Sequence, residues 1–131
     1  MSTDRRVRLI MESDPVRLSA TDPMRRAIAA MVARSAGAAL VVDESGALAG
    51  LLTEKDCFRP ALHASYYQEW RSAVRDHMTA TVITIEASDD VVRAAEMFVE
   101  VKHRVLPVLD EGRPVGLLDR SAVLKELFGS G

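Results

Sequence analysis

The sequence predicts an α/β protein (α+β by some schemes) built from two tandem β-α-β-β-α repeats that pack with pseudo-two-fold symmetry. Three observations predict this class. The chain repeats its own sequence, each copy contains a helical stripe of apolar residues, and each copy contains two apolar segments joined by a Gly-containing turn. A chain of 131 residues, 48% of them hydrophobic, is long enough to bury a core.

An ordered series of identities relates the two halves of the chain. From Val7 onward the second copy follows at an offset of 67 residues, and after a turn that is one residue shorter the offset becomes 66. Hairpin turns tolerate such a change in length. The identical pairs include Val7 and Val74, Met11 and Met78, Ala27 and Ala94, Asp43 and Asp110, and Gly50 and Gly116. Since two copies are too few for a solenoid, we expect two units packed face to face.

Each copy begins with a short extended segment, "DPVRLSA" in the first and "TVITIEA" in the second, followed by a helix start. Thr21-Asp22-Pro23 offers a capping side chain with Pro at the first helical position, and Ser88-Asp89-Asp90 offers the cap without Pro. Apolar residues then recur at helical spacing. They are Met24, Ala27, Ile28, Met31 and Val32 in the first copy, and Val91, Ala94, Ala95, Phe98 and Val99 in the second.

Two apolar strands follow in each copy, "AALVV" with "ALAGLL" and "VLPVL" with "PVGLL". Their near-continuous apolar character indicates that both faces are covered. A second helix closes each copy, from Thr53 or from Asp119. Within one domain of residues 1–131, the predicted boundaries are about 7–62 for repeat one, about 63–73 for a connector and about 74–128 for repeat two.

Charge and cysteine content narrow the functional classes. The chain has 17 basic and 19 acidic residues. This balance does not indicate the strongly basic face that is typical of a nucleic-acid-binding protein. The single cysteine, Cys57, excludes an intrachain disulfide and fits a reducing compartment. No signal peptide is visible, and the longest apolar run, "AGAALVV", is far shorter than the ~20 residues of a membrane span. We therefore expect a cytoplasmic protein whose partners are neither nucleic acid nor membrane.

Three stretches carry a resemblance to a known family: "VRDHMTATVITIEASDDVVRAAEMF", "HRVLPVLDEGRPVGLL" and "LVVDESGALAGLLTEKD". Their ordered occurrence, covering the chain from Val7 to Phe128, resembles the CBS-domain pair, or Bateman module, named after cystathionine β-synthase. The resemblance implies a regulatory module that binds an adenosine-containing ligand (AMP, ADP, ATP or S-adenosylmethionine) between the two repeats and signals by a conformational change. It also implies a homodimer formed through the helices, and an effector protein that the sequence does not identify.

The segment from Gly50 to Asp56 matches the family pattern Gly-x-x-Thr/Ser-x-x-Asp. The ribose of an adenosine-containing ligand offers two neighbouring hydroxyl donors. The Asp56 carboxylate would accept a hydrogen bond from each of them. A phosphate suits the N–H groups and the positive dipole of a helix start, where Thr53 adds a hydroxyl donor. Gly50 lets the backbone approach a ligand without an intervening side chain. The alternative interpretation is structural, because Thr-x-x-Asp also resembles a helix capping box.

The second copy keeps the Gly-Leu-Leu and changes the polar pair. Asp119 replaces Thr53 and is itself a good N-cap, whereas Ala122 replaces Asp56 and removes the ribose acceptor. An anionic Asp119 also repels a phosphate. We therefore expect one nucleotide site, and leave open whether the second cleft binds anything.

Basic residues precede the first hairpin strand of repeat two. Lys102, His103 and Arg104 stand where repeat one has Ser35-Ala36-Gly37, and the resemblance implies phosphate contacts from residues near this position. A solvated basic cluster is the alternative. Backbone groups and small apolar contacts for an adenine are expected from the extended entry segments, with Val16 and Val41 as candidates.

Catalysis and a catalytic metal or cofactor are not expected. Cys57 and the three histidines lack metal-ligand spacing, and no nucleophile elbow or P-loop occurs. We expect Cys57 to be a half-buried packing residue and His77 to be structural. A dimeric scaffold or interaction protein without a nucleotide ligand is the alternative function. Tyr66, Tyr67 and Trp70 support it weakly, because packing between the repeats explains these aromatic residues equally well.

Overall fold

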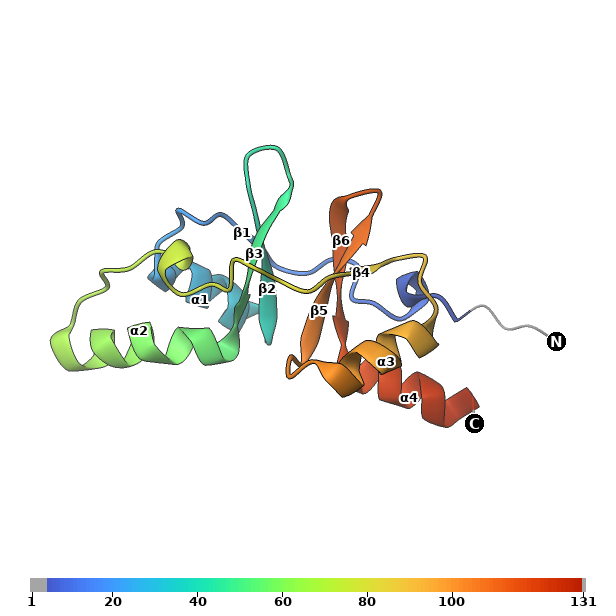
Figure 1. Ribbon diagram of the computed structural model, residues 1–131. Helices are drawn as coiled ribbons and strands as arrows, with labels where there is room; N and C mark the ends of the chain where they lie inside the picture. Colours follow the sequence, from blue (N-terminus) through green and yellow to red (C-terminus); the bar gives the residue numbers. More distant parts are fainter. Residues whose placement is uncertain (1–4, 131) are drawn as a thin grey trace. The chain divides into compact units, whose positions relative to one another are not determined.

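The computed structural model describes residues 5–130 and contains two compact units of the same kind (Figure 1). One unit is formed by Pro15–Val82, and the other joins residues 5–14 to residues 83–130. Each contains a three-stranded sheet and two α-helices, which confirms the predicted α/β class and the predicted order of elements. Residues 1–4 and 131 of the predicted domain lie outside the described residues.

The unit of Pro15–Val82 contains one mixed sheet. Its elements are β1 (Arg17–Leu18), α1 (Met24–Ala33), β2 (Ala38–Val42), β3 (Leu48–Thr53), α2 (Glu54–Tyr67) and the 3-10 turn η2 (Val74–Asp76). Strand β1 runs parallel to β2, and β2 pairs antiparallel with β3, so β2 is the central strand. Leu40 and Leu52, which lie in β2 and β3, are completely buried.

The second unit has the same topology. Its elements are the 3-10 turn η1 (Val7–Leu9), β4 (Ile85–Glu86), α3 (Val91–Glu100), β5 (Val105–Asp110), β6 (Arg113–Asp119) and α4 (Arg120–Ser130). Strand β4 is parallel to β5, and β5 is antiparallel to β6. No helix in the described part of the chain is both long and apolar enough to cross a membrane.

The helix starts follow the predicted chemistry in one copy only. Asp90 caps α3, and its Oδ1 accepts the Val92 N–H at 2.7 Å. In the first copy the prediction of Pro at the first helical position is wrong: Pro23 has an extended backbone and is the N-cap of α1. The Asp22 carboxylate instead accepts the N–H of Ser19 at 2.9 Å, which closes the preceding turn.

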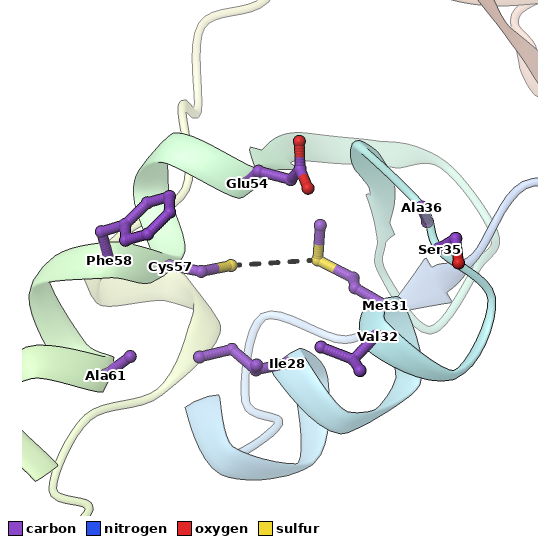
Figure 2. Close-up of a pocket in the computed structure, with 9 residues that line it drawn as sticks. All are labelled: Ile28, Met31, Val32, Ser35, Ala36, Glu54, Cys57, Phe58 and Ala61. Carbon is purple, nitrogen blue, oxygen red and sulfur yellow. Dashed lines mark hydrogen bonds between the residues drawn. The ribbon is translucent and has the colours of Figure 1, made fainter. Parts of the chain in front are cut away.

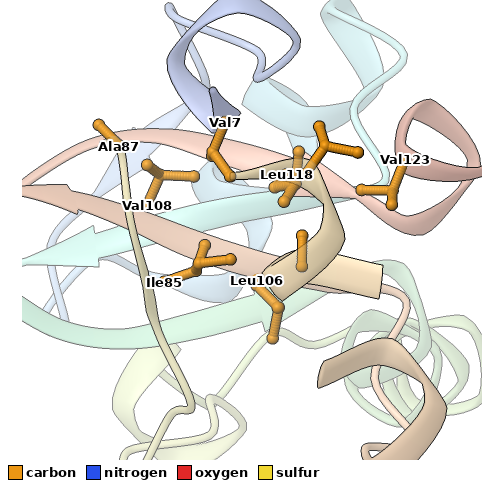
Figure 3. Packing of buried hydrophobic residues seen from close by; sticks show 9 residues of the cluster. Val7, Ile85, Ala87, Leu106, Val108, Leu118 and Val123 are labelled. Carbon is orange, nitrogen blue, oxygen red and sulfur yellow. The ribbon is translucent and has the colours of Figure 1, made fainter. Parts of the chain in front are cut away.

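Each unit has its own apolar core. In the unit of residues 5–14 and 83–130, Val7 packs with a cluster drawn from β4, β5, β6 and the two helices (Figure 3). Its members include Ile85, Leu106, Val108 and Leu118, all at most 2% exposed. The other unit buries Met24, Ala27, Ala39, Val41 and Val74 in the same manner. The predicted cover on both faces of the hairpin strands is confirmed, because consecutive residues of β2 and β5 are buried.

Each sequence copy gives its leading segment to the unit built from the other copy. Residues 5–14 lie against residues 83–130, where Glu12 and Leu117 exchange two backbone hydrogen bonds of 2.8 and 3.0 Å. Correspondingly, Thr79 and Leu51 exchange bonds of 2.9 and 3.0 Å in the unit of Pro15–Val82. The units of the structure are therefore offset from the repeats of the sequence.

The two hairpin turns differ, as the one-residue deletion requires. In the second unit Asp110 pairs with Arg113, and the two turn residues Glu111 and Gly112 have φ values of 52° and 80°. Two positive φ values are typical of a type I′ turn. The turn between β2 and β3 is longer. It is closed by Asp43, whose Oδ1 accepts the N–H of Ser45 at 2.9 Å and of Ala47 at 3.0 Å.

Candidate functional site

The candidate site is the junction of β3 and α2, where Thr53 is the N-cap of the helix. Asp56, at the third helical position, accepts two hydrogen bonds on Oδ2: one from the Thr53 N–H at 2.9 Å and one from the Thr53 hydroxyl at 3.0 Å. The capping interpretation of this pair is therefore found in the structure. Both of these hydrogen bonds fall on Oδ2, Oδ1 of Asp56 accepts none within residues 5–130, and the residue is half-buried.

The hydrogen bond in which an Asp carboxylate accepts the N–H of the residue three positions earlier recurs elsewhere in the chain. Asp22, Asp76 and Asp89 accept the N–H of Ser19, Ala73 and Glu86, at 2.9, 2.9 and 3.0 Å. The backbone bond of Asp56 is thus a general turn device of this fold. The added features at Asp56 are the Thr53 hydroxyl and the N-terminus of a 14-residue helix, whose first N–H groups favour an anion.

The second unit keeps the cap and lacks the acceptor. Asp119 Oδ1 accepts the Ser121 N–H at 2.7 Å, which confirms the expectation that Asp119 caps α4. Ala122 occupies the position of Asp56, and its methyl group offers no hydrogen bond. The two helix starts therefore differ in the chemistry they present to a ligand.

Gly50 packs closely against a neighbouring segment of its unit. In the sequence analysis this glycine is assigned to the close approach of a ligand. A methyl group on Gly50 would lie 2.7 Å from the Thr79 carbonyl oxygen and 2.9 Å from Met78 Sδ. In the second unit a methyl on Gly116 would lie 2.5 Å from the Glu12 carbonyl oxygen. The glycine shared by both copies is explained by its close contact with the exchanged segment.

Val16 and Val41, the candidate adenine contacts, are core residues of the unit of Pro15–Val82. Their side chains are 6% and 0% exposed. The Val16 carbonyl oxygen also accepts the Leu40 N–H at 2.9 Å, so this backbone acceptor already has a partner. Both side chains are therefore part of the core. A contact of these residues with a ligand would involve their backbone atoms.

Lys102, His103 and Arg104 lie exposed between α3 and β5, in the other unit. The Arg104 carbonyl oxygen accepts the N–H of Arg120, the first residue of α4, at 2.9 Å. Gly37 makes the equivalent bond to Glu54 at the start of α2. The structure thus brings Thr53, Asp56 and Gly37 together, and places the basic residues beside Asp119. A ligand shared by Asp56 and the basic residues stays a prediction.

Sequence reasoning missed a pocket beside this site, between α1 and α2. Cys57 lines the pocket, with Sγ 3.9 Å from Met31 Sδ and 3.4 Å from the Thr53 carbonyl oxygen. Burial, and next the negative charges of Asp56 and Glu54, raise the pKa of the Cys57 thiol to about 11. The half-buried packing role expected for Cys57 is confirmed, and a thiol of this kind is a poor nucleophile at neutral pH.

Two of the three histidines make contacts within the unit of Pro15–Val82. His77 Nε2 lies 2.8 Å from the Ser72 hydroxyl, consistent with the structural role expected for it. The rings of His63 and Tyr67 are in contact, with centroids 4.7 Å apart and planes tilted by 40°. Among residues 5–130, no three His, Cys, Asp or Glu side chains are grouped so that they could hold a metal ion.

Two units of one topology, each a mixed three-stranded sheet with two helices, define a tandem α/β module. Comparison with known families assigns the class: residues 7–62 and 74–129 each match the CBS domain, and the chain belongs to the CBS-domain family.

Relatives and solved structures agree with this assignment. The chain is 31% identical over 124 residues to the uncharacterized protein MJ1225 of Methanocaldococcus jannaschii, with 95% of this chain and 43% of that protein covered. It is 32% identical over 89 residues to the CBS domain-containing protein CBSCBSPB2 of Arabidopsis thaliana, with 68% of this chain and 16% of that protein covered. The chain therefore spans less than half the length of these curated relatives.

The fold is that of solved CBS pairs. The CBS-pair protein CBSX2 of Arabidopsis thaliana superposes with a TM-score of 0.81 at 22% identity, covering 98% of this chain and 97% of that one. CBSX2 has also been solved in complex with AMP, with a TM-score of 0.80 at 22% identity, covering 95% and 97%. The CBS pair of protein MJ0100, solved with 5′-methylthioadenosine and S-adenosyl-L-methionine, has a TM-score of 0.81 at 21% identity, covering 98% and 100%.

Proposed function

We propose that this chain is a regulatory module that binds an adenosine-containing nucleotide, AMP, ADP or ATP, at the start of α2 and signals by a conformational change. Membership of the CBS family supports the proposal. Two solved structures of the same fold, of CBSX2 and of MJ0100, are complexes with adenosine-containing ligands, and they support it as well. The observation that carries it is the half-buried Asp56 carboxylate, which is held by Thr53 on one oxygen and has its other oxygen available.

The chemistry of this junction suits a nucleotide. The cap fixes the Asp56 carboxylate, so its Oδ1 is oriented before a ligand arrives and accepts ribose hydroxyl protons at little entropic cost. The first N–H groups of α2 and its positive dipole end favour a phosphate. Lys102, His103 and Arg104 are further candidates for phosphate contacts.

Calorimetric titration with AMP, ADP, ATP and S-adenosylmethionine tests the proposal. The variant Asp56→Asn keeps an oxygen that can cap the helix and removes the negative charge. We expect at least one nucleotide to bind the wild type and to bind the variant at least about tenfold more weakly, because a hydrogen bond to a charged group contributes about 1.5–3 kcal/mol.

Asp76→Asn is the matched control, because Asp76 makes the same backbone bond at 2.9 Å and is not part of the candidate site. It should bind as the wild type does. Equal affinity of Asp56→Asn and wild type would remove Asp56 from the site, and no heat with any of the four compounds would favour the scaffold.

S-adenosylmethionine is the alternative ligand, and the MJ0100 complex favours keeping it in the panel. It carries the same ribose diol and no phosphate, so Asp56 serves both ligand classes. Preference for a nucleotide would show phosphate recognition, and preference for S-adenosylmethionine would show that the basic residues have another role.

A dimeric scaffold without a nucleotide ligand is the second candidate function. Tyr66 and Tyr67, at the end of α2, are 76% and 67% exposed, and such aromatic residues are enriched at interfaces. We further propose a cytoplasmic homodimer that acts on an effector protein and has no catalytic activity of its own. Sedimentation velocity tests the dimer, and the absence of turnover of a bound nucleotide tests the last statement.

A further inference from the structure

A pocket of about 450 Å³ opens between α1 and α2 on the surface of the unit of Pro15–Val82 (Figure 2). Two sulfur atoms meet in it, one from each helix. Met31 of α1 and Cys57 of α2 both line the pocket, and Cys57 Sγ lies 3.9 Å from Met31 Sδ. Figure 2 shows the two side chains pointing toward one another. The pocket therefore presents a thiol and a thioether to whatever enters it.

The separation of the two sulfur atoms suits a shared metal ion. A bond from a sulfur ligand to a metal ion such as zinc is about 2.3 Å long, so two sulfur ligands of one ion lie at most about 4.6 Å apart. The observed 3.9 Å falls within this limit. It corresponds to an angle of about 115° at the ion, so the ion lies to one side of the line between the sulfur atoms. Both side chains can therefore bind one ion from their present positions.

The residue types select a soft monovalent ion. Thiolate and thioether ligands prefer Cu(I). A Cys57 thiolate and one monovalent ion have no net charge together, and most of the side chains that line the pocket are apolar. An uncompensated charge among such side chains is costly. Glu54, the charged residue of the lining, attracts an entering cation.

Zinc fits this pocket less well than Cu(I). Structural zinc sites have four ligands, drawn from Cys, His, Asp and Glu. Among residues 5–130, no three side chains of these types are grouped so that they could hold a metal ion. A site with one thiol and one thioether therefore lacks the ligands that zinc requires.

The second unit has neither sulfur atom. Phe98 and Val123 stand at the positions of Met31 and Cys57. Phe98 packs against the core of its unit, and Val123 is part of that core and 2% exposed. The fold therefore accepts carbon side chains at both positions, and packing does not require the sulfur pair of the first unit.

We infer that Cys57 and Met31 form a binding site for a soft monovalent metal ion, Cu(I). The ion enters from the open side of the pocket and binds Cys57 Sγ and Met31 Sδ, and the thiol proton passes to the solvent. The hydrogen bond from the thiol to the Thr53 carbonyl oxygen, now 3.4 Å long, is lost with that proton. The inference does not depend on the proposed nucleotide, because no nucleotide takes part in it.

Titration of the full chain with Ag(I) and with Cu(I) tests the inference. Ag(I) has the charge and the ligand preference of Cu(I) and is not oxidised by air. Native mass spectrometry counts the bound ions, and competition with a chromophoric Cu(I) chelator measures the affinity. We expect one ion per chain. One ion shared by two chains would mean that two Cys57 thiols hold it, and would contradict the pair within one chain.

Two variants separate the contributions of the ligands. Cys57→Ser should abolish binding. Met31→Leu removes the thioether and keeps an apolar side chain of similar size, an exchange that cores usually tolerate. It should bind Cu(I) at least about tenfold more weakly than the wild type, because one of two ligands is lost. Circular dichroism checks that both variants fold.

Met24→Leu is the matched control. Met24 lies on the same helix as Met31 and is completely buried, and it does not line the pocket. This variant should bind Cu(I) as the wild type does.

X-ray absorption at the copper edge counts the sulfur neighbours of the ion independently of the affinity. We expect two in the wild type and one in Met31→Leu. An unchanged affinity and sulfur count in Met31→Leu would leave a thiol acting alone and overturn the paired site. Binding no stronger in the wild type than in Cys57→Ser would overturn the site altogether, and a preference for Zn(II) over Ag(I) would contradict the soft monovalent ion.

Discussion

At the residue scale, Gly50 and Gly116 show how a duplicated position is retained for packing. Both seat the exchanged segment of their unit, and a methyl group at either would meet a backbone oxygen at 2.7 Å or less. A backbone oxygen cannot turn away as the end of a flexible side chain can. The shared Gly is therefore a consequence of the fold and does not distinguish the two helix starts.

We expect Gly50→Ala and Gly116→Ala each to lower the free energy of unfolding by about 2 kcal/mol or more, because overpacking at a tight contact forces backbone shifts. Urea denaturation measures the loss. Gly37→Ala is the control, since its methyl would make an ordinary 3.7 Å contact with Glu54. Equal stability of all three variants would refute the packing role.

Asp43 gives a pH-dependent prediction. A side-chain hydrogen bond from Ser45, and then backbone bonds beginning with that from Ala47, lower the pKa of the Asp43 carboxyl below 3.8. A lowered pKa stabilises the folded state above pH 3.8, and this contribution is lost as the pH falls through the folded-state pKa.

The stability difference between wild type and Asp43→Ala should therefore shrink in acid, below about pH 3.8. Urea titrations at several pH values measure it. A difference that stays constant through this range would contradict the role of the ionised carboxylate.

At the element scale, the order of helices and strands followed from apolar spacing and turn residues, and the structure confirms it. The start of α1 could not be predicted from Thr21-Asp22-Pro23, because the structure uses the Asp22 carboxylate to close a turn with Ser19 and places Pro23 at the N-cap. Neither was the exchange of leading segments, since sequence identity shows which residues correspond and not which unit they join.

The exchange has a consequence for fragments of the chain. Pro15–Val82 is continuous and contains its whole core cluster, so a fragment of these residues should fold alone. A fragment of residues 83–131 lacks Val7 and the pairing of Glu12 with Leu117, and should fold only when a peptide of residues 1–14 is added. Amide NMR spectra measure both. A fragment 83–131 that folds unaided would contradict the role of the exchanged segment.

At the scale of the whole molecule, sequence identified the family and the residues in which its two copies differ. It also identified the junction of Thr53 and Asp56, together with the capping alternative. The sequence assigns Gly50, Val16 and Val41 to ligand contacts, and the structure adds that all three also have packing roles, which sequence alone did not reveal. Their contact with a ligand stays a prediction. The α1–α2 pocket was not predicted from the sequence, because the residue types along a helix do not show whether the space beside the helix is filled.

The central claim is that the chain has one ribose acceptor, supplied by Asp56, with no equivalent at Ala122. Native mass spectrometry of the purified chain, titrated with the nucleotide that binds best in calorimetry, counts ligands per chain directly. We predict that one ligand binds each chain and that none binds Asp56→Ala at the same concentration. Two ligands of equal affinity per chain, or a single ligand that survives Asp56→Ala, would contradict the claim.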